Sequence, residues 1–156
     1  MEVTLKQSLI VTYENPQFSL AVEEGFPQTN IVFTSLTPVL RTGFLPATLA
    51  ILKEQLPGVL ATKCHNDGGW GFEREVEDTE IGHLFEHILI QNISEFRESY
   101  LMEDSKITGE TQWDWTRDAK GIFNIRICSE SPYDQVLTEA IEKSISIVNL
   151  ILSEVS

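Results

Sequence analysis

The feature that most constrains this fold is one long segment, residues 79–100, in which apolar side chains recur every three or four positions. That spacing matches the turn of an α-helix, so these side chains share one face of the helix and bury it in a core. They are Ile81, Leu84, Phe85, Ile88, Leu89 and Phe96. Asp78 stands just before the segment and is expected to cap the helix.

The remaining segments predict strands and two further helices. Strands are expected at residues 8–14, 18–25, 30–36, 59–64, 108–115 and 121–128, and helices at residues 45–58 and 131–152. Ser131 and Pro132 are expected to start the last helix. This order predicts an α+β fold, a two-layer sandwich in which a mostly antiparallel sheet carries helices packed on one side.

Length and composition indicate one globular domain that spans residues 1–156. Hydrophobic residues make up 42% of the chain, which is enough for a core at this length. The 2 cysteines do not form a disulfide framework, and no apolar run is long enough to cross a membrane. The first residues lack the pattern of a secretory signal. We therefore expect a cytoplasmic protein.

The chain is strongly acidic, with a net charge of -13 from 24 acidic and 11 basic residues. Such a surface repels phosphates and anionic lipids, so neither nucleic acid nor membrane is expected as a partner. It attracts cations, including arginine-rich peptides. Solubility alone is the simpler explanation of the charge.

A histidine pair lies near the start of the predicted helix, in the order His83-x-x-Glu86-His87. Positions four apart share a helix face, so both imidazoles can reach one metal ion. Glu86 lies one turn from His83 and can take a proton from a metal-bound water. This is the H-x-x-E-H order of the inverzincins. The pattern predicts a zinc site, and the alternative is two half-buried histidines that make ordinary hydrogen bonds.

A zinc site of this kind needs a third protein ligand. Cys128 is the favoured candidate because it ends the strand 121–128 on the less apolar face, which also carries Arg126. A thiolate with two imidazoles is an accepted zinc set. The alternatives are Glu130, Glu139 on the last helix and His65 in the glycine-rich loop. A free cysteine is more commonly a small buried residue, which is the other interpretation of Cys128.

Trp113 and Trp115 lie two positions apart in the predicted strand 108–115, so their rings point to the same side. Such a pair can line a groove and stack on arginine guanidinium groups. More often it packs against a sheet or under a helix, and we expect packing here.

Two stretches of the chain, LPGVLATKCHNDGGWGFEREVEDTEIGHLFEHILIQ and TRDAKGIFNIRI, resemble the N-terminal domain of cyanophycin synthetase. The shared features are a Leu-Pro-Gly start, a cysteine, a glycine-rich loop, a helix with the GH and EH pairs, and a Thr-Arg turn before a strand. The resemblance covers residues 56–130. It implies a polymer-binding domain that in some members has a metallopeptidase-like site related to pitrilysin-type peptidases. Synthetase activity is not expected, because the chain has no glycine-rich phosphate loop.

Applied to this chain, the resemblance implies that His83 and His87 are metal ligands and that Glu86 is the base. It implies that Arg117, in the Thr-Arg turn, holds a substrate carboxylate, and Arg126 is a second candidate for substrate binding. The implied fold is that of the pitrilysin-type and S-ribosylhomocysteine lyase metallohydrolases.

The chain departs from the family pattern at Cys128, where the family strand usually carries a glutamate nearby. A thiol at this position gives a His-His-Cys set like that of the S-ribosylhomocysteine lyase family, or it abolishes the site.

Two functional hypotheses follow. The first is a zinc-dependent hydrolase of peptide or isopeptide bonds that acts on arginine-bearing or cyanophycin-like substrates. The second is a non-catalytic binding module for an arginine-rich polymer or a partner protein, and a purely structural zinc site is a third outcome. By analogy, pitrilysin-type enzymes pair two similar domains, so a homodimer is also expected.

Overall fold

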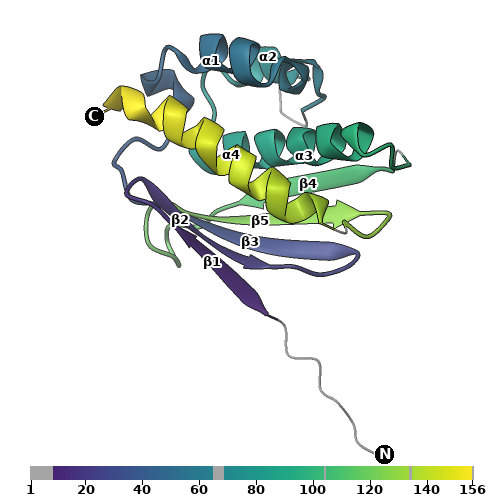
Figure 1. The fold of residues 1–156 in the computed structure, drawn as a ribbon. Helices are drawn as coiled ribbons and strands as arrows, with labels where there is room; N and C mark the ends of the chain where they lie inside the picture. Colours follow the sequence, from purple (N-terminus) through teal and green to yellow (C-terminus); the bar gives the residue numbers. More distant parts are fainter. Residues whose placement is uncertain (1–8, 65–68, 104, 134, 156) are drawn as a thin grey trace, which may run out of the picture.

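The structure is a computed structural model that describes residues 9–64, 69–103, 105–133 and 135–155. Its five-stranded antiparallel sheet carries the helices on one side (Figure 1). The strands are β1 (Ile10–Glu14), β2 (Phe18–Glu23), β3 (Gln28–Ser35), β4 (Ile107–Gln112) and β5 (Ile122–Ser129). The α-helices are α1 (Thr48–Gln55), α2 (Phe72–Glu75), α3 (Ile81–Ser99) and α4 (Val136–Leu152), and the 3-10 helices are η1 (Thr42–Phe44), η2 (Pro57–Ala61) and η3 (Ser153–Val155). The predicted α+β class, with a sheet layer and a helical layer, is confirmed.

The sheet has the strand order β1-β2-β3-β5-β4, and one of its faces is buried under the helices. Along β3, Thr29, Ile31 and Phe33 are buried, whereas Asn30 and Val32 between them are exposed. Successive side chains of a strand point to opposite faces, so this alternation separates an inner face from an open outer face. The same alternation continues along β5.

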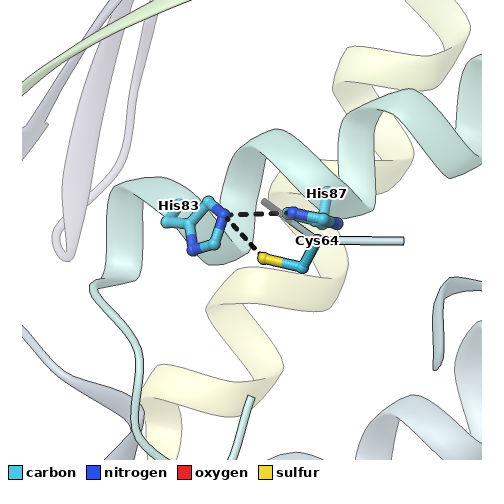
Figure 2. Close-up of side chains that lie close together, drawn as sticks. All are labelled: Cys64, His83 and His87. Carbon is cyan, nitrogen blue, oxygen red and sulfur yellow. Dashed lines mark hydrogen bonds between the residues drawn. The ribbon is translucent and has the colours of Figure 1, made fainter. Parts of the chain in front are cut away.

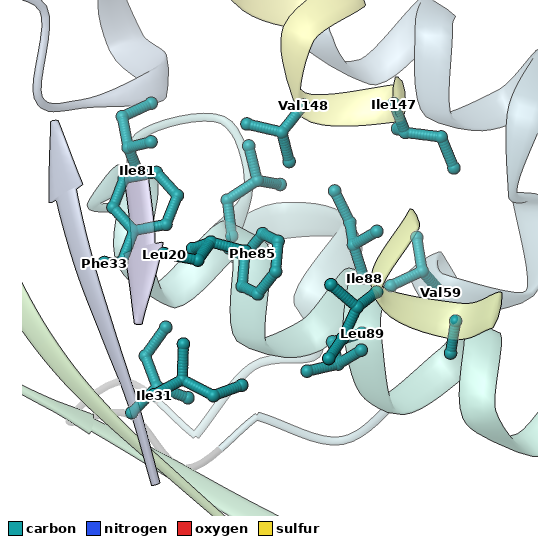
Figure 3. Packing of buried hydrophobic residues seen from close by; sticks show 14 of the residues in the cluster. Leu20, Ile31, Phe33, Val59, Ile81, Phe85, Ile88, Leu89, Ile147 and Val148 are labelled. Atoms are coloured by element: carbon teal, nitrogen blue, oxygen red, sulfur yellow. The ribbon is translucent and has the colours of Figure 1, made fainter. Parts of the chain in front are cut away.

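The centre of the core lies between α3 and the strands β2 and β3. The ring of Phe85 on α3 lies 5.6 Å from the ring of Phe33 and 6.3 Å from that of Phe18, measured between centroids. Phe18 and Phe33 stack on each other at 4.8 Å. Figure 3 shows the residues around Phe85 that complete this cluster. Aromatic pairs at these distances add to the stabilisation that burial gives.

The first turn of α3 lies directly on β5. A Cβ atom at Gly82 would lie 2.3 Å from Cγ of Phe123, so a residue with a side chain does not fit there. The absence of a side chain therefore lets the helix backbone approach the sheet closely at this point. The following turn of α3 contacts β4, where the Thr111 hydroxyl donates a hydrogen bond to Glu86.

Strand β4 forms one edge of the sheet. It pairs with β5 from Ile107 opposite Ser129 to Gln112 opposite Asn124, and no described strand lies on its other side. Its unpaired edge therefore presents backbone groups that can bind another extended chain.

The prediction of a strand at residues 59–64 is wrong, because the chain forms η2 there. Pro57 occupies the first position of η2, and the amide of Val59 bonds back to the carbonyl of Leu56 at 3.1 Å. Proline at the start of a helical turn favours this conformation over a strand.

The prediction that Asp78 caps α3 is also wrong. Glu80 is the N-cap residue, and it makes no side-chain capping bond. Asp78 instead accepts a hydrogen bond from Nε of Arg41 at 2.9 Å. The ion pair with Arg41 therefore replaces the expected capping interaction.

The last helix begins at Val136 rather than at Ser131. The carbonyl oxygens of Ser131 and Pro132 accept hydrogen bonds from Nη2 of Arg97 at 3.1 and 3.4 Å. Arg97 is buried, so its guanidinium needs such acceptors, and they come from a segment that stays outside the helix.

Strand β4 ends at Gln112, so Trp113 and Trp115 lie in the turn after it rather than in the strand. Both tryptophan rings pack against Phe123, with centroids 5.6 Å away in each case. The pair therefore packs against the sheet as predicted, and both rings also line a small pocket, which was the alternative.

Among the described residues, no helix has both the length and the apolar character required to cross a lipid bilayer.

We expect Gly82→Ala to lower the free energy of unfolding by about 1–3 kcal/mol, because the new methyl group overlaps the ring of Phe123. Urea denaturation measures the change. Gly71→Ala is the control, since a Cβ there meets only the Thr62 carbonyl oxygen at 3.8 Å. Equal stability of the two variants would contradict the close contact between α3 and β5.

Candidate metal centre

Helix α3 places two imidazoles side by side near its start. His83 and His87 lie one turn apart, and their Nε2 atoms are 3.1 Å from each other (Figure 2). The two rings are nearly perpendicular, with an interplanar angle of 83°. The prediction that this spacing brings both rings to one point is confirmed.

Cys64 joins the two histidines from the segment that follows η2. Its Sγ lies 3.6 Å from Nε2 of His83, and the three donor atoms all lie within 4.8 Å of one another. Zinc bonded to nitrogen at about 2.0–2.1 Å and to sulfur at about 2.3 Å in a tetrahedron places two nitrogens about 3.3 Å apart, and nitrogen and sulfur about 3.6 Å apart. The distance of 3.1 Å between the two histidine nitrogens and that of 3.6 Å between Sγ of Cys64 and Nε2 of His83 match these separations. The cluster can therefore hold a metal ion.

Threonine hydroxyls fix the orientation of both imidazoles. Thr62 donates its hydroxyl proton to the Val59 carbonyl at 2.7 Å, so its oxygen accepts from Nδ1 of His87, 3.3 Å away. That bond places the ring proton of His87 on Nδ1 and leaves a lone pair on Nε2. An outer partner of this kind commonly orients a metal-ligating histidine.

The Thr79 hydroxyl does the same for His83, because it lies 2.8 Å from Nδ1 of that ring. The other neighbours of this hydroxyl are carboxylate oxygens of Glu75 and Glu80, each 3.5 Å away. The hydroxyl therefore accepts from Nδ1–H of His83 in one tautomer of the ring and donates to Nδ1 in the other. In the first tautomer both Nε2 atoms present lone pairs to the centre of the cluster, and in the second Nε2–H of His83 donates a hydrogen bond to Nε2 of His87.

Both imidazoles are neutral at neutral pH. Burial lowers the pKa of His83, against the opposing charges of Glu75 and Glu80. Burial, together with the neighbouring His83, lowers the pKa of His87 to about 3. The ring of Phe72 stacks on His87 with centroids 3.9 Å apart and shields it from water. Neutral imidazole is the form that binds metal ions.

Glu86 lies on the same part of α3 and is only 5% exposed. It accepts a hydrogen bond from the Thr111 hydroxyl on β4 at 2.8 Å. Burial raises the pKa of Glu86 to about 7, and the bond from Thr111 offsets part of the rise. In the metal-free protein this carboxyl therefore exchanges its proton near neutral pH.

A pocket of about 570 Å³ opens over the cluster. Both histidines and Glu86 line it from α3, and Thr62 and Lys63 line it from the segment before Cys64. The opposite wall is the run of residues 107–111 of β4. Successive side chains of a strand point to opposite faces, so a pocket on one face would be lined by every second residue. Here five consecutive residues of β4 line the pocket, which means that the edge of the strand borders it.

The structure does not bring Cys128 into the cluster. Cys128 follows Asn124 and Arg126 on the outer face of β5, whereas α3 packs on the inner face with Phe123 and Ile127. The sheet itself therefore separates Cys128 from the histidines.

The alternative third ligands also lie outside the cluster, except for His65, which falls outside the described residues. Glu130 is exposed, and Glu139 accepts a hydrogen bond from the Tyr100 hydroxyl at 2.6 Å. Cys64 is the member of the cluster that the sequence reasoning missed. Its place just before the glycine-rich stretch of sequence that precedes the histidine pair was the available signal.

The two predicted substrate-binding arginines do not line the pocket over the cluster. Arg117 is exposed and pairs with Asp118 at 3.4 Å. Arg126 pairs with Glu110 across the outer face of the sheet, and Glu110 is the member of this pair that lines the pocket.

Comparison of the chain with protein families, curated proteins and solved structures gave no match. The resemblance to the N-terminal domain of cyanophycin synthetase, and to the pitrilysin-type fold, stays a prediction.

Thr79→Val removes the hydroxyl that orients His83 and nearly keeps the shape of the side chain. We expect the affinity for Zn²⁺ to fall about 10- to 100-fold, as measured by competition with a chromogenic chelator. Thr108→Val is the control, because Thr108 lines the same pocket without a hydrogen bond to either histidine. An equal affinity in the two variants would show that the hydroxyl does not position the ring.

We expect Glu86→Gln to stabilise the metal-free protein at neutral pH. The pKa of Glu86 rises from 4.5 to about 7 on folding, so the unfolded chain ionises first and stability falls as pH rises between these values. The full loss is at most about 3 kcal/mol. The free energy of unfolding of each protein is measured by denaturation from pH 4 to 8 and plotted against pH. The two plots should diverge up to about pH 7 and then run parallel. Curves that stay parallel throughout would refute the raised pKa.

Proposed function

We propose that Cys64, His83 and His87 bind one zinc ion and that Glu86 serves as the general base for hydrolysis of a peptide or isopeptide bond. The observation that carries this proposal is the convergence of three donor atoms within 4.8 Å of one another, two of whose separations suit tetrahedral zinc, with both histidines and the buried Glu86 lining one pocket. Each residue type matches the chemistry required of it, since thiolate and imidazole bind zinc and a carboxylate accepts a proton.

The hydrogen bonds around the cluster leave room for a cation at its centre. Thr62 and Thr79 lie at Nδ1 of His87 and His83, and when both Nδ1 atoms carry the ring protons the Nε2 lone pairs face each other across 3.1 Å. Without a metal ion, the same separation suits an N–H···N hydrogen bond between the two rings. Both rings resist protonation, because burial lowers their pKa values, which favours a metal ion over a proton in this role.

Three protein ligands leave one position of a zinc tetrahedron open, as catalytic zinc sites do. A zinc ion there supplies Lewis acidity that activates water. Glu86 then takes one proton from the attacking water and passes it to the leaving nitrogen. Water and an amide become a carboxylic acid and an amine, and Thr111 keeps the Glu86 carboxylate in place.

An extended main chain fits this pocket better than a compact molecule. The unpaired edge of β4 borders the pocket along residues 107–111, opposite Glu86 and the histidines. An extended peptide adds to such an edge through backbone hydrogen bonds. This arrangement favours peptide-type substrates, and the net charge of -13 favours arginine-bearing ones through long-range attraction.

Metal content tests the ligand set. The protein purified with zinc present should hold about one zinc ion per chain by elemental analysis, and Cys64→Ser should lose most of it. Cys128→Ser is the matched control and should keep its zinc, because the outer face of the sheet carries Cys128. Loss of zinc from Cys128→Ser alone would contradict the proposed ligands.

Hydrolysis of an internally quenched peptide library tests the chemistry. We expect Glu86→Gln to keep zinc and to lose activity by at least about 100-fold, the usual contribution of a general base. Zinc with no hydrolysis in the unmodified protein would point to a structural site. Absence of stoichiometric zinc would favour a binding module instead.

A further inference from the structure

A second, smaller pocket lies next to the candidate metal centre. Its volume is about 260 Å³, and its walls include Phe44, Trp113 and Trp115. Both pockets are bordered by the same two parts of the chain. At the start of α3, Glu80 lines the small pocket and His83 lines the large one. At the end of β4, Thr111 lines the large pocket, and Trp113, two residues later, lines the small one.

Three aromatic side chains line the small pocket, and the two tryptophans among them are held by contacts with β5. The two tryptophan rings lie 6.4 Å apart at an angle of 38°. Trp115 donates its indole N–H to the carbonyl of Ile122 at 3.0 Å, and both rings rest on Phe123. Phe44 on η1 is 74% exposed and Trp113 is 39% exposed, so apolar surface faces solvent here. Exposed apolar patches of this kind mark binding sites in many proteins.

The charges at this pocket disfavour a cationic occupant. Arg41 is already paired with Asp78 and Glu80. Lys120 lines the pocket as well, and in the described part of the chain it forms no ion pair. An arginine or lysine side chain would therefore meet an unpaired ammonium group of the same sign.

The size and position of the pocket suit one side chain of a longer substrate. Pockets for whole small molecules occupy about 300–1,000 Å³, so this one is small for an entire ligand. Trp113 follows Thr111 by two residues, so the two lie at most about 7 Å apart along the chain. Thr111 contacts Glu86. A peptide that pairs with β4 therefore reaches the small pocket with a side chain that lies a few residues from the peptide bond held beside Glu86.

We infer that the pocket formed by Phe44, Trp113 and Trp115 is a specificity site that takes one large apolar or aromatic side chain of an extended peptide lying along β4. The inference rests on the proposed function, because the metal centre defines which bond is cleaved. It adds the substrate class, peptides with an apolar anchor on one side of the cleaved bond, and it names the residues that select it.

Peptide binding to zinc-loaded Glu86→Gln protein tests the inference without cleavage. The probes are capped alanine–serine peptides of about ten residues, long enough to span both pockets, with a single Phe, Leu, Arg or Glu placed at each position in turn. Tryptophan fluorescence reports binding, since Trp113 and Trp115 line the pocket. We expect Phe and Leu at one or two positions to bind at least about tenfold more tightly than Arg at the same positions.

Phe44→Ala, made in the same background, should remove this preference and weaken binding of the best peptide about tenfold. Tyr100→Ala is the matched control, because Tyr100 is also an exposed aromatic residue, 53% exposed, and lines neither pocket. Equal binding of all peptides, a preference for Arg, or equal losses in the two variants would overturn the inference.

The same measurement separates this inference from the proposed function. If the unmodified protein cleaves peptides without regard to apolar side chains, the specificity site fails and the hydrolase stands. If peptides bind with the expected Phe44 dependence but no zinc is held, the binding surface stands and the zinc-dependent chemistry fails.

Discussion

The contact between Gly82 and Phe123 is the constraint on which the candidate site depends. It lets the first turn of α3 lie directly on β5, and the next turn then brings Glu86 to Thr111 on β4. His83 lies one residue after Gly82, so its position is set by the same contact. The part of the site on α3 is therefore held by the packing of a helix against a sheet, whereas Cys64 comes from the irregular segment after η2.

The polar groups at this site are costly to the metal-free protein. Glu86 and His87 are buried, and burial disfavours the charged form of each. A protein gains nothing in stability from a buried carboxyl whose pKa is raised to about 7. Ionisable groups with such shifts cluster at functional sites, where the environment serves chemistry instead of stability. The threonines at Nδ1 of both imidazoles fit the same interpretation, since they leave both Nε2 atoms facing one point.

Local patterns in the sequence predicted much of this arrangement. The apolar spacing of residues 79–100 gave the central helix, and the i, i+4 spacing gave the histidine pair. The third member of the cluster was beyond such reasoning, because Cys64 lies 19 residues before His83 and reaches it only through tertiary packing. Alternation along β5 already placed Cys128 beside Arg126, but the sequence did not show that α3 covers the opposite face. The helix starts were misjudged because the tertiary partners Arg41 and Arg97 bind the expected capping segments.

X-ray absorption at the zinc edge decides whether Cys64, His83 and His87 bind the ion, because it counts and identifies the atoms around it. We predict one sulfur at about 2.3 Å and two imidazole nitrogens at about 2.0–2.1 Å, with one further light atom. The sulfur contribution should vanish in Cys64→Ser and persist in Cys128→Ser. A zinc environment of nitrogen and oxygen alone in the unmodified protein would contradict it.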